Sequence, residues 1–105
     1  MGRKILYIAG PYRGPRIIDV KRNIRRADEA METAWTAGWL PVCPHLNSAF
    51  IDGLVPDSEI LPAYIDLMKR CDAVWFLPGW SDSEGCQAEY RVAIRCGLRI
   101  IKSLQ

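Results

Sequence analysis

The sequence predicts a small doubly wound α/β domain, a flavodoxin-like parallel sheet of strand order 2-1-3-4 with helices on both faces. Its 105 residues suffice for one domain with a core and are too few for a second one. Short apolar runs alternate with longer segments in which apolar residues recur every three or four positions. Alternating strands and helices imply right-handed crossovers, and therefore a parallel sheet that is covered on both faces.

The expected elements follow from these two periodicities. Four runs of apolar, β-favouring residues are expected strands: 4–9, 39–43, 73–77 and 99–102. Three segments with helical spacing are expected helices: 20–35, 57–71 and 86–96. The segment 44–56 has no helical period and contains Pro, Asn, Ser, Asp and Gly, so it is expected to be a long loop.

Composition and charge give no support to several classes of function. The formal net charge of +2 is too small to predict a nucleic-acid surface. A basic run on the first expected helix lies off its apolar stripe and is expected to be solvated: Lys21, Arg22, Arg25 and Arg26. No apolar run approaches the ~20 residues of a membrane span, and the apolar stretch after Met1 is too short for a signal peptide. We therefore expect a cytoplasmic protein without a membrane partner.

The cysteines indicate neither a metal site nor a disulfide framework. None of the four forms a Cys-x-x-Cys pair, and all lie in apolar segments, so they are expected to be reduced core thiols: Cys43, Cys71, Cys86 and Cys96. His45 is the only histidine, and Cys43 with His45 supplies two candidate ligands without a second pair. The sequence therefore predicts no metal and no cofactor.

The predicted strand order places a crevice between two loops. In the order 2-1-3-4 the direction of winding reverses between the first and third strands, and a crevice opens at their carboxyl ends. The loops at these ends, 9–14 and 78–85, are the most glycine-rich polar loops of the chain. They bring Gly10, Arg13 and Gly14 to one side of the crevice and Ser83 and Gly85 to the other.

Glu89 is a carboxylate on the third expected helix, at helical spacing from Gly85, Val92 and Cys96. That spacing places it on or beside the stripe that faces the sheet. Burial would raise its pKa, whereas the nearby helix N-terminus would lower it, so the sign of the shift stays open. A role in catalysis and a role as a partner of the helix dipole, Arg13 or Arg91 both remain possible.

Several of these segments together resemble the nucleoside 2-deoxyribosyltransferase superfamily, in particular its small single-domain branch. The resemblance lies in residues 7–14, 71–75 and 77–80 and in the acid of the third helix, and it spans nearly the whole chain in order. It implies an enzyme that cleaves the bond between base and sugar, similar to the nucleoside 5′-monophosphate N-glycosidases. The implied partner is a small nucleoside or nucleotide, and relatives that share active sites across subunits imply a homo-oligomer.

The resemblance also implies roles for individual residues. Glu89 matches the nucleophile, and Tyr7 matches the tyrosine that orients this carboxylate and the sugar. Ser83 and Gly85 match the loop that holds a 5′-phosphate, and Arg13 matches a phosphate-binding arginine. A helix N-terminus with one arginine suits such an anion. Each polar residue also has a structural alternative, since Ser83 can cap a helix and Tyr7 can be a core aromatic.

Other candidates have weaker support. Asp82 is the nearest acid in sequence that can protonate a departing base, and it is equally suited to cap the third helix. Trp80 lies beside the crevice, where it can stack on a base or pack in the core or a subunit interface. Three polar residues of the long loop can contact a base from above or satisfy local backbone groups: His45, Asn47 and Asp52.

The sequence departs from the family pattern at two points. The family has an aspartate on its second helix, eight residues before the aspartate that starts the third strand, and this position is Tyr64 here. Asp66 projects to the opposite side of that helix and cannot replace it. The third helix reads Glu-Tyr-Arg where active transferases have Glu-Leu-Gly. Two alternatives therefore remain, a non-catalytic nucleotide-binding regulatory module and an NAD-cleaving enzyme of the related TIR type.

Overall fold

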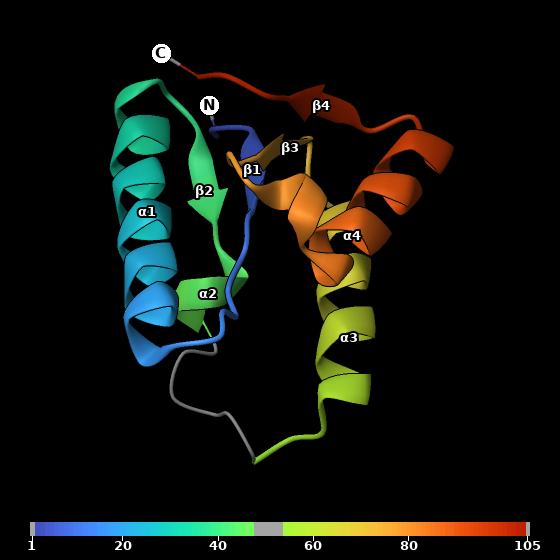
Figure 1. The fold of residues 1–105 in the computed structure, drawn as a ribbon. Helices are drawn as coiled ribbons and strands as arrows, with labels where there is room; N and C mark the ends of the chain where they lie inside the picture. The colour runs from blue at the N-terminus through green and yellow to red at the C-terminus, as the bar shows by residue number, and fades with distance from the viewer. Residues whose placement is uncertain (1, 48–53, 105) are drawn as a thin grey trace.

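The computed structural model describes residues 2–47 and 54–104, apart from the side chains of His45, Asn47 and Asp57. Its elements, in chain order, are β1 (Ile5–Ala9), α1 (Ile17–Thr36), β2 (Leu40–Val42), α2 (Pro44–Asn47), α3 (Asp57–Lys69), β3 (Ala73–Phe76), the 3₁₀ turn η1 (Trp80–Asp82), α4 (Glu84–Arg95) and β4 (Arg99–Ile101). The four strands form one parallel sheet in the order β2-β1-β3-β4. The predicted fold class and strand order are confirmed (Figure 1).

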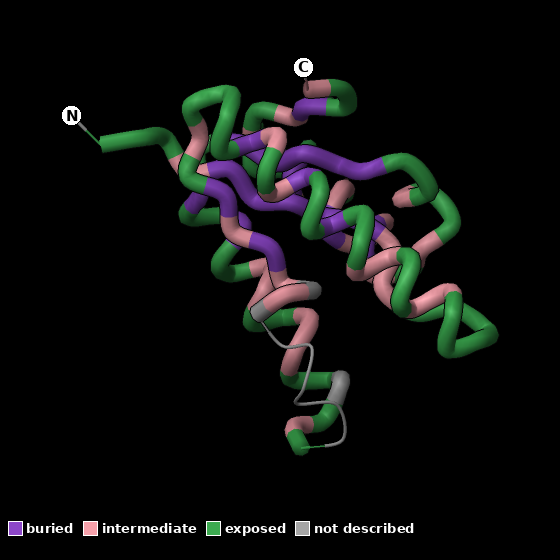
Figure 2. The backbone as a smooth tube through the Cα atoms, turned by 90° about the vertical axis from the view of Figure 1, so that its left-hand side faces the viewer, coloured by how far each residue is buried: buried purple, intermediate pink, exposed green. Residues whose placement is uncertain are grey.

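β1 lies at the centre of the sheet because it pairs with β2 on one side and β3 on the other. Tyr7 illustrates this position, since its backbone is in register with Val42 of β2 and Val74 of β3. A strand that is covered on both faces has no polar side to expose, which explains its continuous apolar run. In Figure 2 the strands form the buried layer between helices that are exposed on their outer sides.

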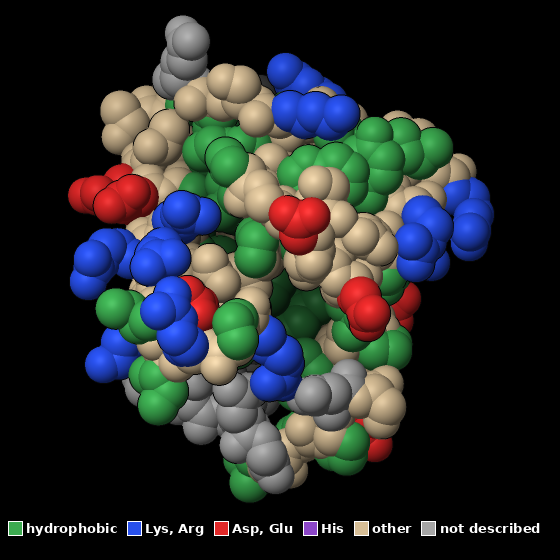
Figure 3. Space-filling model, viewed as in Figure 1, with side chains coloured by type: hydrophobic (Ala, Val, Ile, Leu, Met, Phe, Trp, Pro, Cys, Tyr) green, Lys and Arg blue, Asp and Glu red, His purple; other side chains and the backbone are tan. Residues whose placement is uncertain are grey.

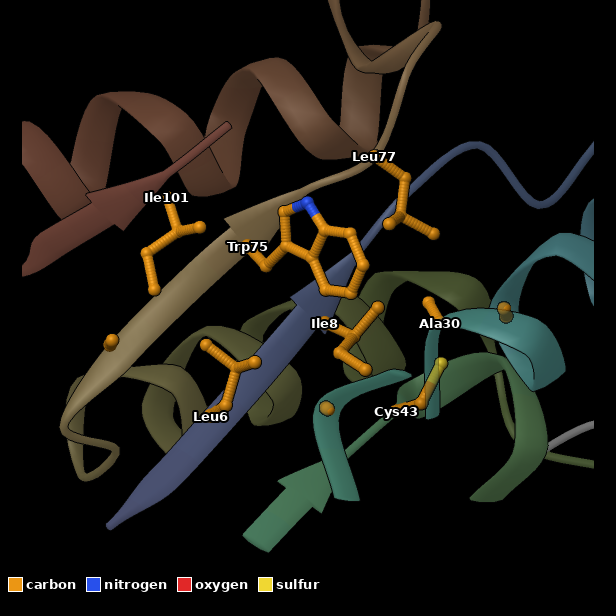
Figure 4. Close-up of a cluster of buried hydrophobic side chains, with 10 residues drawn as sticks. Leu6, Ile8, Ala30, Cys43, Trp75, Leu77 and Ile101 are labelled. Atoms are coloured by element: carbon orange, nitrogen blue, oxygen red, sulfur yellow. The ribbon is translucent and has the colours of Figure 1, made fainter. Parts of the chain in front are cut away.

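The two faces of the sheet carry different cores. Leu6, Ile8 and Trp75 point to the face that α1 covers, where they form a cluster with Cys43, Leu77 and others (Figure 4). α1 contributes three buried alanines to this cluster, and such small side chains let the helix approach the strands closely. Alternation along the strands sends Tyr7 to the opposite face, where α3 and α4 pack.

Hydrogen bonds at two helix starts explain why α1 and α4 begin earlier than expected. At α1, the Asp19 carboxylate accepts a hydrogen bond from the Arg16 backbone N–H at 3.1 Å. At α4, the Ser83 hydroxyl accepts one from the Cys86 backbone N–H at 3.3 Å. Each bond satisfies a backbone donor at a helix end. Each helix therefore begins with exposed residues, Ile17 and Ile18 in α1 and Glu84 in α4, which lie before its buried apolar stripe.

The prediction of a loop over 44–56 is wrong at its beginning, where α2 forms a single helical turn. The Leu46 backbone N–H donates to the Cys43 carbonyl at 3.1 Å, and the Leu46 side chain packs against the core beneath α1. Burial of one leucine therefore folds a segment that is too short to show a helical period. The expectation for residues 48–53 lies outside the described residues.

The structure exposes Trp35, which ends the expected helix 20–35, and Cys96, which was expected to be a core thiol. Trp35 is 46% exposed, and the Arg3 guanidinium lies over its ring at 5.1 Å from the centroid. The same guanidinium donates to the Trp35 carbonyl at 2.7 Å, so the indole serves as a surface platform for Arg3. Cys96 follows the last residue of α4 and is exposed, whereas the other three cysteines are buried.

Within the described residues, no helix combines the length and the apolar character that crossing a membrane requires.

Candidate active site

A cavity of about 1100 Å³ lies where the expected crevice was placed, at the carboxyl ends of β1 and β3. β1 and the loop after it form one side, α4 and η1 form another, and α3 closes the third. Seven of the predicted site residues line it: Tyr7, Gly10, Arg13, Asp82, Ser83, Gly85 and Glu89. In Figure 3 the hollow lies near the middle of the face, with acidic side chains on one side and basic ones on the other.

Glu89 is the one buried charged residue of the described core, with 7% of its surface exposed. The Tyr7 hydroxyl donates a hydrogen bond to Glu89 Oε2 at 2.5 Å. Burial raises the pKa of Glu89 from its usual value to about 7, and the Tyr7 hydrogen bond opposes that rise. Desolvation therefore dominates, which decides a sign that the sequence left open.

Tyr7 is held by the central strand, and its side chain is fully buried. Burial, together with the adjacent Glu89 carboxylate, raises the pKa of the Tyr7 hydroxyl far above its usual range. The phenol therefore stays protonated and remains a donor to Glu89 at all physiological pH values. The pair joins the middle of β1 to the second turn of α4, two segments 82 residues apart.

The N-terminus of α4 opens into the cavity. Ser83 is the N-cap of this helix, so the capping role that the sequence divided between Ser83 and Asp82 belongs to Ser83. A Cβ added at Gly85 would meet only atoms at ordinary contact distance, the nearest at 3.9 Å. Packing within the chain therefore does not require glycine there. The missing side chain instead leaves the first amides of α4 accessible to an anion.

Arg13 and Asp82 both line the cavity from its exposed rim. Arg13 belongs to the loop between β1 and α1, and Asp82 ends η1, directly before the N-cap of α4. Arg91, two residues after Glu89 on α4, adds a second basic side chain to the lining. The cavity thus has a buried acid at its base and charges of both signs near its mouth.

Residues 4–103 match a family model whose description is Domain of unknown function (DUF7768). The chain belongs to this family. No curated protein matches it. The match covers every element from β1 to β4, so the cavity lies entirely within the DUF7768 domain.

The two glycines of the first loop differ in their relation to the cavity. Gly10 lines it, and an added Cβ would lie 3.0–3.3 Å from atoms of the Leu77 side chain, so the end of β1 passes tightly against the segment after β3. Gly14 does not line the cavity. An added Cβ there would lie 2.5 Å from Cβ of Asp19, so this glycine lets the loop pack against the first turn of α1.

Trp80 also lies outside the lining of the cavity. Its ring stacks on Tyr90 at a centroid distance of 4.4 Å and contacts Phe76 at 5.3 Å, within the core beneath α3 and α4. Lys102 lies over the same two stacked rings. The geometry favours the packing role among the alternatives for Trp80. The predicted contacts of the His45 and Asn47 side chains and of Asp52 lie outside the described residues.

Two residues that the sequence did not single out for binding also line the cavity of this DUF7768 domain, Tyr64 and Cys86. Tyr64 stands on α3 one turn after Ile60, and with Leu61 these residues make an otherwise apolar wall. Cys86 precedes Glu89 by three residues on α4, and burial raises the pKa of its thiol to about 11. The spacing of three residues from Glu89 could have indicated that Cys86 lies beside the cavity. No such signal existed for Tyr64, because the position of α3 could not be predicted from the sequence.

Among the residues that the structure describes, no three His, Cys, Asp or Glu side chains are grouped as metal ligands.

Proposed function

We propose that this DUF7768 domain is an N-glycosidase or deoxyribosyltransferase-like enzyme that cleaves the bond between base and sugar in a nucleoside or nucleoside 5′-monophosphate. The observation that carries the proposal is the hydrogen bond from Tyr7 to Glu89 at the base of a large cavity. A buried carboxylate with a raised pKa in a cleft, held in one orientation by a fixed donor, is typical of catalytic acids, bases and nucleophiles. A carboxylate that merely complements a helix dipole has no need of burial.

The first chemical step uses the ionised form of Glu89. Tyr7 holds Oε2, so Oε1 is the oxygen that attacks the anomeric carbon of the sugar. A bond forms between Oε1 and C1′ while the bond from C1′ to the base nitrogen breaks, and the base leaves with the electron pair. Asp82, at the rim of the same cavity, supplies a proton or hydrogen bond to the departing base.

The second step releases the sugar. Water, or the nitrogen of a second base, attacks C1′, the bond to Oε1 breaks, and the Glu89 carboxylate is regenerated. The proton that the attacking water or base loses passes to the Asp82 carboxylate, which gave one up in the first step. Attack by water gives hydrolysis, and attack by a base gives transfer. Because Glu89 has a pKa of about 7, the fraction of ionised nucleophile rises with pH through neutrality, and the rate should rise with it.

A phosphate on the sugar is best accommodated at the start of α4. Ser83, Gly85 and the first amides of the helix line one side of the cavity, and Arg13 lines another. Backbone N–H groups at a helix N-terminus together with a guanidinium suit a dianionic phosphate. This arrangement supports a 5′-monophosphate over a free nucleoside.

One observation favours a second candidate, a non-catalytic nucleotide-binding regulatory module. Among the described side chains of α3, those that line the cavity are Ile60, Leu61 and Tyr64, with no carboxylate among them, and Asp66 is exposed elsewhere on the helix. The family resemblance would place an acid where Tyr64 stands. A cavity that binds nucleotides without this acid is suited to sensing as well as to turnover.

Incubation of the protein with mixed nucleoside monophosphates, followed by chromatography, separates the candidates. The enzyme hypothesis predicts release of free base by the wild type and a loss of at least about 1000-fold in Glu89→Ala, since the substitution removes the nucleophile that the proposed covalent step uses. Glu32→Ala, which removes an exposed acid of α1 outside the cavity lining, is the matched control and should retain base release. Monophosphate binding without release by either protein would favour the regulatory module, and nicotinamide release from NAD would indicate a different substrate.

A further inference from the structure

The positive charge of the chain is concentrated in one segment beside the cavity. Six of the 14 Lys and Arg residues and one of the 12 Asp and Glu residues lie in 13–26, so this segment carries a formal charge of +5 and the rest of the chain −3. The six basic residues, all exposed, are Arg13, Arg16, Lys21, Arg22, Arg25 and Arg26. We call the surface that they form the basic strip. A net charge of +2 conceals this separation.

Helix stability does not explain the basic strip. Lys21 and Arg25 are four residues apart on α1, as are Arg22 and Arg26, so the two members of each pair lie on the same side of the helix. Like charges at this spacing repel and destabilise an isolated helix. Within α1 this repulsion is offset in part, by Asp19 beside Arg22 and by Asp28 and Glu29, which follow Arg25 by three and four residues.

The first turn of α1 arranges part of the basic strip in advance. Arg16 donates to both oxygens of Asp19, at 3.1 and 3.2 Å, and the Arg22 guanidinium lies 3.5 Å from the same carboxylate. One carboxylate thus holds two guanidinium groups side by side and leaves an excess of positive charge. Two such groups at fixed positions suit neighbouring phosphates.

The basic strip is continuous with the cavity. The Asn23 side chain donates to the Tyr12 carbonyl at 3.1 Å, which ties the second turn of α1 to the loop whose Tyr12 and Arg13 line the cavity. Gly14 packs that loop tightly against Asp19. Figure 3 shows Lys and Arg side chains gathered over the N-terminal half of α1, beside the hollow.

We propose that the basic strip binds the phosphates of a single-stranded nucleic acid whose terminal nucleotide enters the cavity. The inference rests on the proposed function only for the identity of the group in the cavity. Ten residues of α1, from Ile17 to Arg26, rise about 15 Å, a length that several phosphates of one strand span. An anionic bilayer would match the charge, but no part of it would reach into a cavity with a buried carboxylate at its base.

Fluorescence anisotropy with a ten-nucleotide single-stranded oligodeoxynucleotide, carrying a 5′-phosphate and a 3′ fluorophore, tests the inference on the intact chain. Four phosphate contacts predict about 50-fold weaker binding at 200 mM than at 50 mM salt. Arg25→Glu with Arg26→Glu should weaken binding at least about tenfold at 50 mM salt and lower the slope of log K against log salt by about 1.4. Both residues are exposed and lie outside the cavity lining, so base release from mononucleotides should stay within about twofold.

Lys69→Glu with Arg70→Glu is the matched control. These residues are exposed at the end of α3, and the double substitution changes the net charge by the same amount. Oligonucleotide binding should stay within about twofold. Equal losses in the two double variants, no saturable binding by the wild type at 50 mM salt, or binding to phosphatidylglycerol vesicles in place of the oligonucleotide would each overturn the inference. Oligonucleotide binding without base release from any substrate would leave the basic strip established and refute the proposed enzyme instead.

Discussion

Two walls of the same cavity are built on different principles. The wall formed by β1 and α4 contains Tyr7, Ser83 and Glu89. Tyr7 donates a hydrogen bond to Glu89, and Ser83 accepts one at the start of α4. The α3 wall offers Ile60 and Leu61 with a single phenol, Tyr64. The comparison teaches that polar groups for chemistry are confined to one side, whereas the other side lowers the dielectric around them and shapes the space for a ligand.

The largest effect that sharpens this comparison is a gain of stability from Glu89→Gln. The pKa of Glu89 is raised to about 7, so between pH 4.5 and 7 the folded protein holds the proton more tightly than the unfolded chain does. The free energy of unfolding of the wild type therefore falls as pH rises to about 7. Glutamine does not ionise, and the variant should be more stable by about 3 kcal/mol at pH 8.

Urea denaturation at pH 4 and pH 8 measures this difference. The advantage of Glu89→Gln should vanish at pH 4, where the carboxyl is protonated in both states. Glu29→Gln, an exposed acid of α1, should differ from wild type by under about 0.5 kcal/mol at both pH values. Equal stability of Glu89→Gln and wild type at pH 8 would show that the carboxylate is not desolvated.

Tyr7→Phe should reduce base release by about tenfold to a hundredfold, because the nucleophile loses the group that orients it. The hydrogen bond from Tyr7 lowers the pKa of Glu89, so its removal should move the rising limb of the pH–rate profile above pH 7. Rates measured from pH 5 to 9 test both effects. Tyr90→Phe, whose ring stacks on Trp80 outside the cavity lining, should keep the wild-type profile. An unmoved limb in Tyr7→Phe would contradict the assigned pairing.

The smallest expected effect belongs to the α3 wall. Tyr64→Leu preserves an apolar surface, so KM should change by less than about tenfold and kcat by less than about twofold. Steady-state kinetics with the best monophosphate substrate separates the two parameters. Tyr64→Phe keeps the ring and removes the hydroxyl, and it should behave like wild type. A hundredfold loss of kcat in either variant would place α3 within the chemistry.

The sequence predicted most of the fold because local spacing encodes it. Apolar residues at steps of three and four marked α1 and α4, and the continuous run in β1 marked a strand with two neighbours. The expected flavodoxin-like strand order is confirmed, and it placed the loops of Arg13 and Gly85 across one crevice. The single turn of α2 was not predicted, because four residues are too few to show a helical period.

Single-residue environments were predicted less well. Trp35 has helical spacing with the buried alanines of α1, yet its side chain is exposed and packs under Arg3. Trp80 comes soon after β3, whose carboxyl end borders the cavity. Its ring nevertheless stacks on Tyr90 and lies outside the cavity lining. In both positions the competing partner comes from a distant segment, and spacing along one element carries no information about it.

By itself the sequence determined the alternation of strands and helices, the edge of the sheet where polar loops meet, and the presence of an acid on the inner side of the last helix. Only the tertiary structure decided that desolvation outweighs the helix dipole at Glu89, that α3 closes the cavity with an apolar wall, and that the basic strip runs into its mouth. The physical reason is that periodicity depends on neighbours a few residues away. Solvation and electrostatic fields depend on every atom within several ångströms, whichever part of the chain supplies it.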